Sequence, residues 1–270
     1  MGIPPLILLT NDDGVSSPGL HAAVEAIADL GELLIMAPDS QQTGAGRSYP
    51  ATSDSTIHVT EIPLGQSHHP AYKAGVSPAQ AVLLAVKRLA SRPIALCISG
   101  INYGENIGSG ITISGTVGAA IEAACFGIPA LAMSLETPKE YHLNPSDAID
   151  FRVAAHFTRY FAEQILTKRL PAGVDLLKVD VPATASPQTP WRTATVSRQR
   201  YYQLVHGPRS QPDEPQDIDY RINILRDIVE PDSDVFVFAI ERLVSVVPIT
   251  IDLTAPVPLS EVTMFFDGRP

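Results

Sequence analysis

The sequence predicts an α/β fold with a doubly wound, mainly parallel sheet of the Rossmann-like type and a C-terminal β-rich extension. In the first half of the chain, short apolar segments alternate with helical segments; the apolar segments are residues 6–10, 33–37, 94–99 and 130–135. Their length and unbroken hydrophobicity are typical of strands buried on both faces. Strands and helices that alternate in this way favour one parallel sheet with right-handed crossovers.

The helical segments of the first half carry recognisable start signals. Ser17 and Ser77 each precede a proline, which places an N-cap residue before a proline at the first helical position. A third helix is predicted at residues 116–126, directly before a glycine that ends it. Residues 44–75 are rich in Gly, Ser, Thr and Pro, and only 56–62 is predicted to form a strand there.

The second half of the chain has a different pattern. Ser146 is predicted to cap a long amphipathic helix that runs to about residue 170. β-Branched segments predict strands at 176–181, 193–205, 235–239 and 244–253. We therefore expect a single domain over residues 1–270, in which 1–140 form the core and 141–270 add the helix and a β-rich extension.

Composition limits the classes of function. The 270 residues carry a formal net charge of −10, which argues against a nucleic-acid polymer or an anionic membrane as the partner. Cys97 and Cys125 lie in apolar stretches, so we expect two buried thiols in a reducing compartment rather than a disulfide. The N-terminus shows neither a signal peptide nor a membrane span, which favours a cytoplasmic protein.

Polar residues gather where the predicted strands end. Asn11, Asp12 and Asp13 follow the first strand, Thr43 follows the second and Asn102 follows the strand at 94–99. Because the carboxyl ends of parallel strands share one edge of a sheet, we expect these loops to meet around one pocket. Two adjacent ionised carboxylates repel each other, so a bound cation is expected between them. An all-oxygen donor set suits Mg²⁺, Mn²⁺ or Ca²⁺ rather than Zn²⁺.

The start of the third helix is a candidate anion site. Ser114, Gly115 and Thr116 combine two hydroxyls with a glycine and the unpaired backbone N–H groups of a helix N-terminus. A cation beside such a site is the arrangement that metal-assisted phosphoester hydrolysis needs. The alternatives are that Asp12 or Asp13 caps a turn and that Ser114 is an ordinary N-cap.

Four short strings occur in a specific order: Leu-Leu-Thr-Asn-Asp-Asp-Gly at 8–14, Ala-Pro-Asp at 37–39, Ser-Gly-Ile-Asn at 99–102 and Ser-Gly-Thr-Val at 114–117. In this order they resemble the SurE family of nucleotidases. Looser similarity at 179–182 and 244–249 extends the resemblance over nearly the whole chain. It implies a phosphatase that depends on a divalent metal and releases phosphate from nucleoside 5′- or 3′-monophosphates.

The resemblance also implies roles for individual residues. Asp12, Asp13, Thr43 and Asn102 would hold one Mg²⁺ or Mn²⁺ per subunit, with Thr43 standing where the family usually has serine. A homodimer or tetramer that exchanges a C-terminal arm would fit the segment around 235–253. The residues that would face the substrate phosphate are Asn11, Asn102, Ser114, Gly115 and Thr116.

The leading hypothesis is attack by a metal-activated water, with Asp12 or Asp13 as the base. A covalent aspartyl-phosphate is the mechanistic alternative. A non-catalytic, metal-dependent nucleotide or phosphate sensor on the same fold is the functional alternative. Glu105 stands where the family often has a small residue; we interpret it as a solvated loop charge, with an outer-shell water partner as the alternative. His206 is a hypothetical proton donor.

Overall fold

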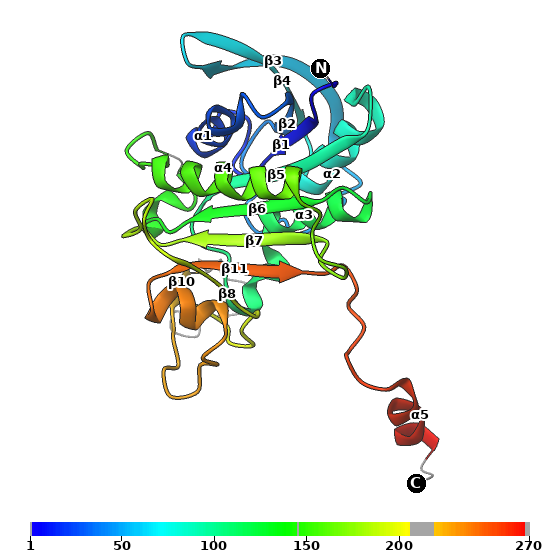
Figure 1. The fold of residues 1–270 in the computed structure, drawn as a ribbon, viewed down its shortest axis with the longest axis vertical. Helices are drawn as coiled ribbons and strands as arrows, with labels where there is room; N and C mark the ends of the chain where they lie inside the picture. The colour runs from blue at the N-terminus through cyan, green and yellow to red at the C-terminus, as the bar shows by residue number, and fades with distance from the viewer. Residues whose placement is uncertain (1, 145, 206–218, 268–270) are drawn as a thin grey trace, which may run out of the picture.

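A nine-stranded sheet forms the centre of the computed structural model, which describes residues 2–144, 146–205 and 219–267 (Figure 1). The strands are, in spatial order, β3 (Asp54–Leu64), β4 (Ser67–Gly75), β2 (Glu32–Pro38), β1 (Leu6–Thr10), β5 (Ile94–Tyr103), β6 (Ala130–Leu135), β7 (Leu176–Val181), β11 (Val244–Ile249) and β8 (Trp191–Thr193). The run from β4 to β7 is parallel, whereas β3 pairs antiparallel with β4 and β11 pairs antiparallel with β7. The predicted mainly parallel α/β sheet is confirmed.

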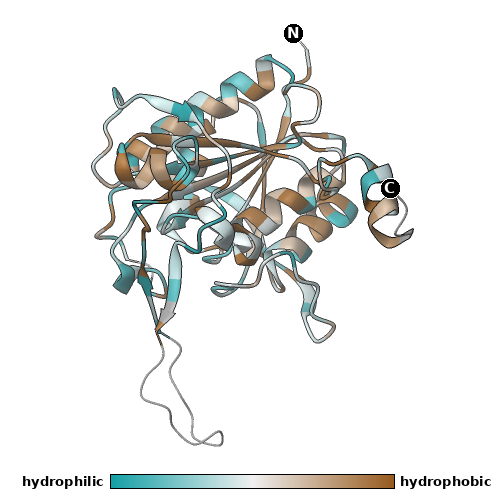
Figure 2. Ribbon diagram, turned by 90° about the horizontal axis from the view of Figure 1, so that it is seen from below, coloured by the Kyte–Doolittle hydropathy of each residue, from teal (hydrophilic) through white to brown (hydrophobic). Residues whose placement is uncertain are grey.

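Helices cover both faces of the sheet. One face carries α1 (Pro18–Ile27) and α4 (Arg152–Thr167), and the other carries α2 (Pro78–Leu84) and α3 (Gly115–Cys125). The buried strand β1 serves both layers, because Ile7 and Leu9 pack on the α1 and α4 side. Leu6 and Leu8 pack on the α2 and α3 side. Side chains alternate along a strand, so a strand with helices on both faces is apolar throughout. Figure 2 shows these apolar strands between the helical layers.

The order of the strands reverses direction next to β1. The chain passes from β1 through α1 to β2 on one side, and later through α2 to β5 on the other side of β1. The carboxyl ends of β1 and β5 therefore flank a topological switch point, where open α/β sheets bind ligands. This position is where Asp12 and Asn102 lie.

The crossovers do not all have the same hand. The β5–α3–β6 and β6–α4–β7 connections run in the same direction along the sheet but use opposite faces. They therefore have opposite hands, and the prediction of uniformly right-handed crossovers is wrong for one of them. Phe157 and Phe161 of α4 pack with Ile98 and Leu131, so α4 covers apolar strand residues on the face that it shares with α1.

Several local predictions differ from the structure. The strand predicted at 193–205 is a strand only at Thr193 and at 202–205. Residues 67–75 form β4, which closes a hairpin with β3 in a segment predicted as loop. The long helix begins at Arg152 after a cap at Phe151, not at Ser146. Residues 236–240 form a π-helical turn rather than a strand, with Val237 and Phe238 buried in two separate clusters. Cys97 is buried as expected, but Cys125 is exposed at the end of α3.

The remaining elements extend from the main sheet. β9 (Tyr202–Val205) and β10 (Asp219–Ile222) form a separate antiparallel pair. Beyond β11 the chain leaves the body and forms α5 (Leu259–Asp267) in its tail (Figure 1). The division into a core of residues 1–140 and an extension of 141–270 stays a prediction.

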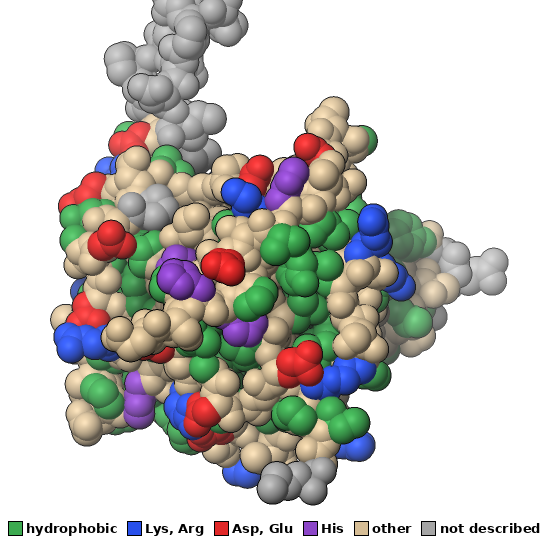
Figure 3. All heavy atoms as spheres, turned by 90° about the horizontal axis from the view of Figure 1, so that it is seen from above, with side chains coloured by type: hydrophobic (Ala, Val, Ile, Leu, Met, Phe, Trp, Pro, Cys, Tyr) green, Lys and Arg blue, Asp and Glu red, His purple; other side chains and the backbone are tan. Residues whose placement is uncertain are grey.

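The surface and the helices bear on possible partners. On the face shown in Figure 3, acidic and basic side chains are interspersed rather than gathered into one basic patch. Within the described ranges, no helix combines the length and the apolar character that crossing a membrane requires.

Candidate active site

The turn after β1 carries the two carboxylates into the interior. Asp12 and Asp13 are 4% and 7% exposed. The Asn11 amide closes the turn by donating a hydrogen bond from Nδ2 to the Gly14 carbonyl at 3.0 Å. Gly14 adopts φ +96°, and a Cβ atom there would lie 3.4 Å from the backbone of Ser40. Glycine permits both the left-handed backbone and the close passage of the loop after β2.

The N-terminus of α3 lies directly against Asp12. Thr116 Oγ1 donates to Asp12 Oδ1 at 2.5 Å, and a Cβ atom on Gly115 would lie 2.7 Å from Asp12 Oδ2. Burial raises the pKa of Asp12 to about 6, although the Thr116 hydroxyl and the backbone N–H groups of Thr116 and Gly115 act in the opposite direction. Ser114 accepts a hydrogen bond from the Val117 N–H at 3.1 Å, so it caps α3 as the simpler interpretation predicted.

Asp13 is held between two loops. Its Oδ1 accepts a hydrogen bond from Gln41 Nε2 at 3.1 Å, and its Oδ2 accepts one from the Tyr103 N–H at 3.3 Å. Burial raises the pKa of Asp13 well above the usual range, and the charge of Asp12 raises it further. The pair therefore disfavours two negative charges unless a cation is bound.

One cavity of about 360 Å³ joins several of the predicted site residues. Asp12, Thr43, Asn102 and Ser114 lie on its wall. Asn102 Nδ2 donates to the Gly104 carbonyl at 2.6 Å, which fixes the amide plane and leaves Oδ1 as its acceptor atom. The other polar and aromatic residues of the wall include Glu105, His142, Arg200, Tyr202 and Tyr220.

The predicted set does not all face the cavity. Asn11, Asp13, Gly115 and Thr116 are not on its wall. Gly115 and Thr116 lie against Asp12 at the start of α3, and Asn11 closes the turn through Gly14. His206 falls outside the described residues. The convergence of three loops from β1, β2 and β5 is nevertheless the arrangement expected at the carboxyl edge of a parallel sheet.

The donor set fits a hard divalent cation. The buried carboxyl of Asp12, the hydroxyl of Thr43 and the amide of Asn102 share the cavity wall, Asp13 is next to Asp12 in the chain, and all four groups offer oxygen. Asn11 Oδ1 is buried without a hydrogen-bond partner in the part of the chain that the structure describes. Among the described residues, no three His, Cys, Asp or Glu side chains cluster as metal ligands would. A metal here would therefore depend on neutral oxygens and water in addition to the carboxylates.

Glu105 corrects a sequence-based interpretation. It is 3% exposed rather than a solvated loop charge, because Tyr201 and Tyr202 cover it from almost a hundred residues away in the chain. The Tyr202 hydroxyl donates to the Glu105 carbonyl at 3.4 Å. Burial raises the pKa of the Glu105 carboxyl to about 7, with the two tyrosine hydroxyls acting in the opposite direction.

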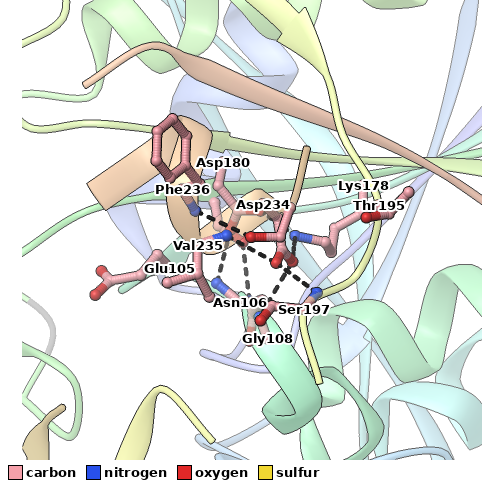
Figure 4. A network of polar contacts seen from close by, with 12 residues as sticks. Glu105, Asn106, Gly108, Lys178, Asp180, Thr195, Ser197, Asp234, Val235 and Phe236 are labelled. Carbon is pink, nitrogen blue, oxygen red and sulfur yellow. Dashed lines mark hydrogen bonds and ion pairs between the residues drawn. The ribbon is translucent and has the colours of Figure 1, made fainter. Parts of the chain in front are cut away.

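A buried ion cluster fixes the loop that follows β5, and sequence reasoning missed it (Figure 4). Lys178 Nζ lies 2.5 Å from Asp180 and 3.2 Å from Asp234, and all three side chains are 0% exposed. Asp180 accepts a hydrogen bond from the Asn106 N–H at 2.7 Å, and Asp234 accepts one from the Gly108 N–H at 3.1 Å. The cluster thus attaches one wall of the cavity to β7 and to the C-terminal extension.

Comparison with known proteins places this geometry in a family. The model of the family described as Survival protein SurE matches residues 7–203. A protein from Thermococcus kodakarensis named 5′-nucleotidase SurE is 38% identical over 98% of this chain and 99% of its own length. One of the same name from Methanocella arvoryzae is 39% identical over 92% and 93%. The crystal structure of the SurE protein from Aquifex aeolicus has a TM-score of 0.76 and 26% identity, covering 97% of this chain and 100% of that one. This chain belongs to the SurE family.

Proposed function

We propose that the protein is a metal-dependent 5′-nucleotidase, which hydrolyses nucleoside monophosphates to nucleoside and phosphate. The observation that carries this proposal is the buried Asp12–Asp13 pair, in which Asp12 lies against the N-terminus of α3 on the wall of the cavity. A cation site next to a helix N-terminus can hold a phosphoryl group from two sides. Relatives that match this chain over nearly its whole length carry the name 5′-nucleotidase SurE.

The residues proposed to hold one Mg²⁺ or Mn²⁺ per subunit are Asp12, Asp13, Thr43 and Asn102. When bound, the ion would polarise a phosphoryl oxygen and lower the pKa of a water molecule. Gln41 and the Tyr103 N–H orient the Asp13 carboxyl, and Thr116 orients that of Asp12. Thr43 offers the same hydroxyl as the usual serine, with an extra methyl group.

Side chains and backbone groups of the protein would bind the substrate phosphate and accept the proton of the attacking water. Ser114 stands on the cavity wall at the N-terminus of α3, where the helix dipole favours an anion. We assign the phosphate-facing side to Asn11, Asn102, Ser114, Gly115 and Thr116. Asp12 or Asp13 would accept the proton of the attacking water. Label from ¹⁸O-water that appears in an enzyme carboxylate after one turnover would instead identify an aspartyl-phosphate intermediate.

The direct test is phosphate release from a panel of nucleoside 5′- and 3′-monophosphates. Release is expected with Mn²⁺ or Mg²⁺ and should stop when EDTA removes the metal. Restoring excess metal should restore the rate, which separates metal loss from unfolding. Binding of nucleotide in the presence of metal, without turnover of any substrate in the panel, would favour the non-catalytic sensor instead.

We also propose that the protein is a homodimer or tetramer joined through its C-terminal tail. The arm was predicted around residues 235–253, but β11 pairs with β7 and β8 of its own chain, so the segment free to exchange begins after Ile249. Leu259, Phe265 and Phe266 of α5 are 72%, 81% and 78% exposed, as expected for a helix that covers a second copy. A chain ending at residue 252 should lose mass in light scattering; an unchanged assembly would exclude the tail.

A further inference from the structure

Glu105 has a buried oxygen that the fold does not use. Its side chain is 3% exposed, and Oε2 has no hydrogen-bond partner among the described residues. Burying an acceptor without a partner is unfavourable, so such groups in a native structure call for an explanation. The residue lies on the wall of the cavity that also contains Asp12 and Asn102. A ligand in that cavity can supply the missing donor.

The backbone around Glu105 is held firmly. The Asn106 N–H donates to Asp180 at 2.7 Å, and Asn106 Nδ2 donates to Ser134 Oγ at 2.9 Å. Figure 4 shows the Glu105 side chain pointing away from the Lys178 ion cluster. The carboxyl is therefore not a further counter-ion for the buried lysine. Its direction is set by a backbone that the cluster fixes.

The surroundings of Glu105 on the cavity wall are aromatic. The rings of Tyr202 and Tyr220 meet edge to face with centroids 5.2 Å apart, and His142 stacks on Tyr220 with centroids 6.0 Å apart. All three side chains line the same cavity. Aromatic rings offer surfaces to a nucleobase, and a carboxyl accepts hydrogen bonds from neutral donors. An anionic phosphate is instead repelled by a carboxylate.

We propose that Glu105 is a specificity-determining residue whose carboxyl accepts a hydrogen bond from the nucleoside part of the substrate. The donor is a ribose hydroxyl or an exocyclic amino group of the base. This inference rests on the nucleotidase function proposed above and identifies the part of the substrate that the Glu105 side chain contacts. An analogue that lacks this donor leaves the Glu105 carboxyl without a hydrogen-bond partner. The enzyme should therefore have a lower kcat/KM for that analogue than for the natural substrate.

The test compares Glu105→Ala with the wild-type enzyme on AMP and on phenyl phosphate, both with Mn²⁺. Phenyl phosphate carries an aromatic ring but neither ribose nor base amine. The ratio of kcat/KM for AMP to that for phenyl phosphate is expected to fall about tenfold, the effect of roughly 1.4 kcal/mol. Glu105→Gln keeps the volume and one acceptor oxygen, so it should retain part of the preference.

Three AMP analogues identify the donor. They lack the 2′-hydroxyl, the 3′-hydroxyl or the 6-amino group. The wild-type enzyme should discriminate against one of them, and Glu105→Ala should lose that discrimination alone. Glu61→Ala, which removes an exposed carboxylate from β3, serves as the matched control and should keep the wild-type ratio.

The outcomes separate this inference from the proposed function. A wild-type enzyme that hydrolyses none of these esters would overturn the nucleotidase itself. An active enzyme whose Glu105→Ala variant keeps the wild-type ratio, or loses AMP and phenyl phosphate equally, would overturn the role of Glu105. Thermal denaturation of both variants checks that they are folded, and the ratio of kcat/KM for two substrates does not depend on the fraction of enzyme that is folded.

Discussion

Two pairs of buried carboxylates have opposite electrostatic surroundings. Asp180 and Asp234 share the ammonium group of Lys178, which forms an ion pair with each. Asp12 and Asp13 form no ion pair with a Lys, Arg or His among the described residues; their partners are neutral hydroxyl, amide and backbone groups. Lys178 thus compensates one of the two charges of the inner pair, whereas the pair at the cavity has no compensating cation among the described residues.

The difference separates a structural cluster from a candidate catalytic one. Burial alone would lower the pKa of Lys178, but the two carboxylates raise it, so the ammonium stays charged. Burial raises the pKa of both Asp12 and Asp13, which means that the pair holds its charges only when a cation is supplied from outside. Removing a charge should therefore impair activity at the pair of Asp12 and Asp13, and stability at the pair of Asp180 and Asp234.

The largest effect is expected at the cavity. Asp13→Asn should reduce kcat/KM for a nucleoside monophosphate about a thousandfold, or about 4 kcal/mol, because it removes a proposed metal ligand. The Tm of the metal-free protein should not fall, since the variant relieves a like-charge contact with Asp12. Mn²⁺ should raise the Tm of the wild-type protein but not that of the variant.

The same substitution in the compensated pair is the matched control. Asp180→Asn should lower stability while keeping most of the activity, because it breaks an ion pair and touches no proposed metal ligand. If both variants lost activity to the same degree with equal loss of Tm, the contrast between the two pairs would be wrong.

The second effect concerns the cation of the inner cluster. Lys178→Met should lower the free energy of unfolding by about 3 kcal/mol, because it leaves two buried carboxylates without a counter-charge. Urea denaturation measures the loss, and Lys168→Met, at an exposed position, should change stability by less than about 0.5 kcal/mol.

A double variant checks the reason for that loss. Lys178→Met with Asp180→Asn removes one of the two charges together with the lysine. Asp234 keeps hydrogen bonds from the N–H groups of Gly108, Ser197 and Val235. The double variant should recover part of the lost stability. A double variant that is no more stable than Lys178→Met alone would contradict uncompensated charge as the cause of the loss.

The same contrast shows which parts of the site the sequence could predict. Asp12, Thr43 and Asn102 were expected to meet because each follows a strand, and parallel strands end at one edge. Lys178 and Asp234 are 56 positions apart and belong to different elements, so no local pattern joins them. Glu105 was misread for the same reason: the tyrosines that bury it follow about a hundred residues later.

The fold shows a similar limit. The buried parallel strands were predictable because apolar runs of this length have few alternatives. β4 was missed because its first half is polar: His68 is exposed and His69 is half-buried, in the part of the strand that pairs only with β3. The hand of the β6–α4–β7 crossover follows from the packing of α4 on the same face as α1, a contact between helices that are far apart in the chain.

The smallest effect concerns the pH dependence of stability. Burial raises the pKa of Glu105 from 4.5 to about 7, so the folded protein holds this proton more tightly than the unfolded chain does. The resulting stabilisation is complete below pH 4.5 and is lost as the pH rises through 7. Between pH 5.5 and 8, the wild-type protein should therefore lose at least about 1.4 kcal/mol relative to Glu105→Gln, the equivalent of one pKa unit. Asp12 and Asp13 titrate in both proteins, so the difference between the two urea-denaturation series isolates Glu105. Parallel curves would mean that the carboxyl is exposed to water and that its unpaired oxygen needs no ligand.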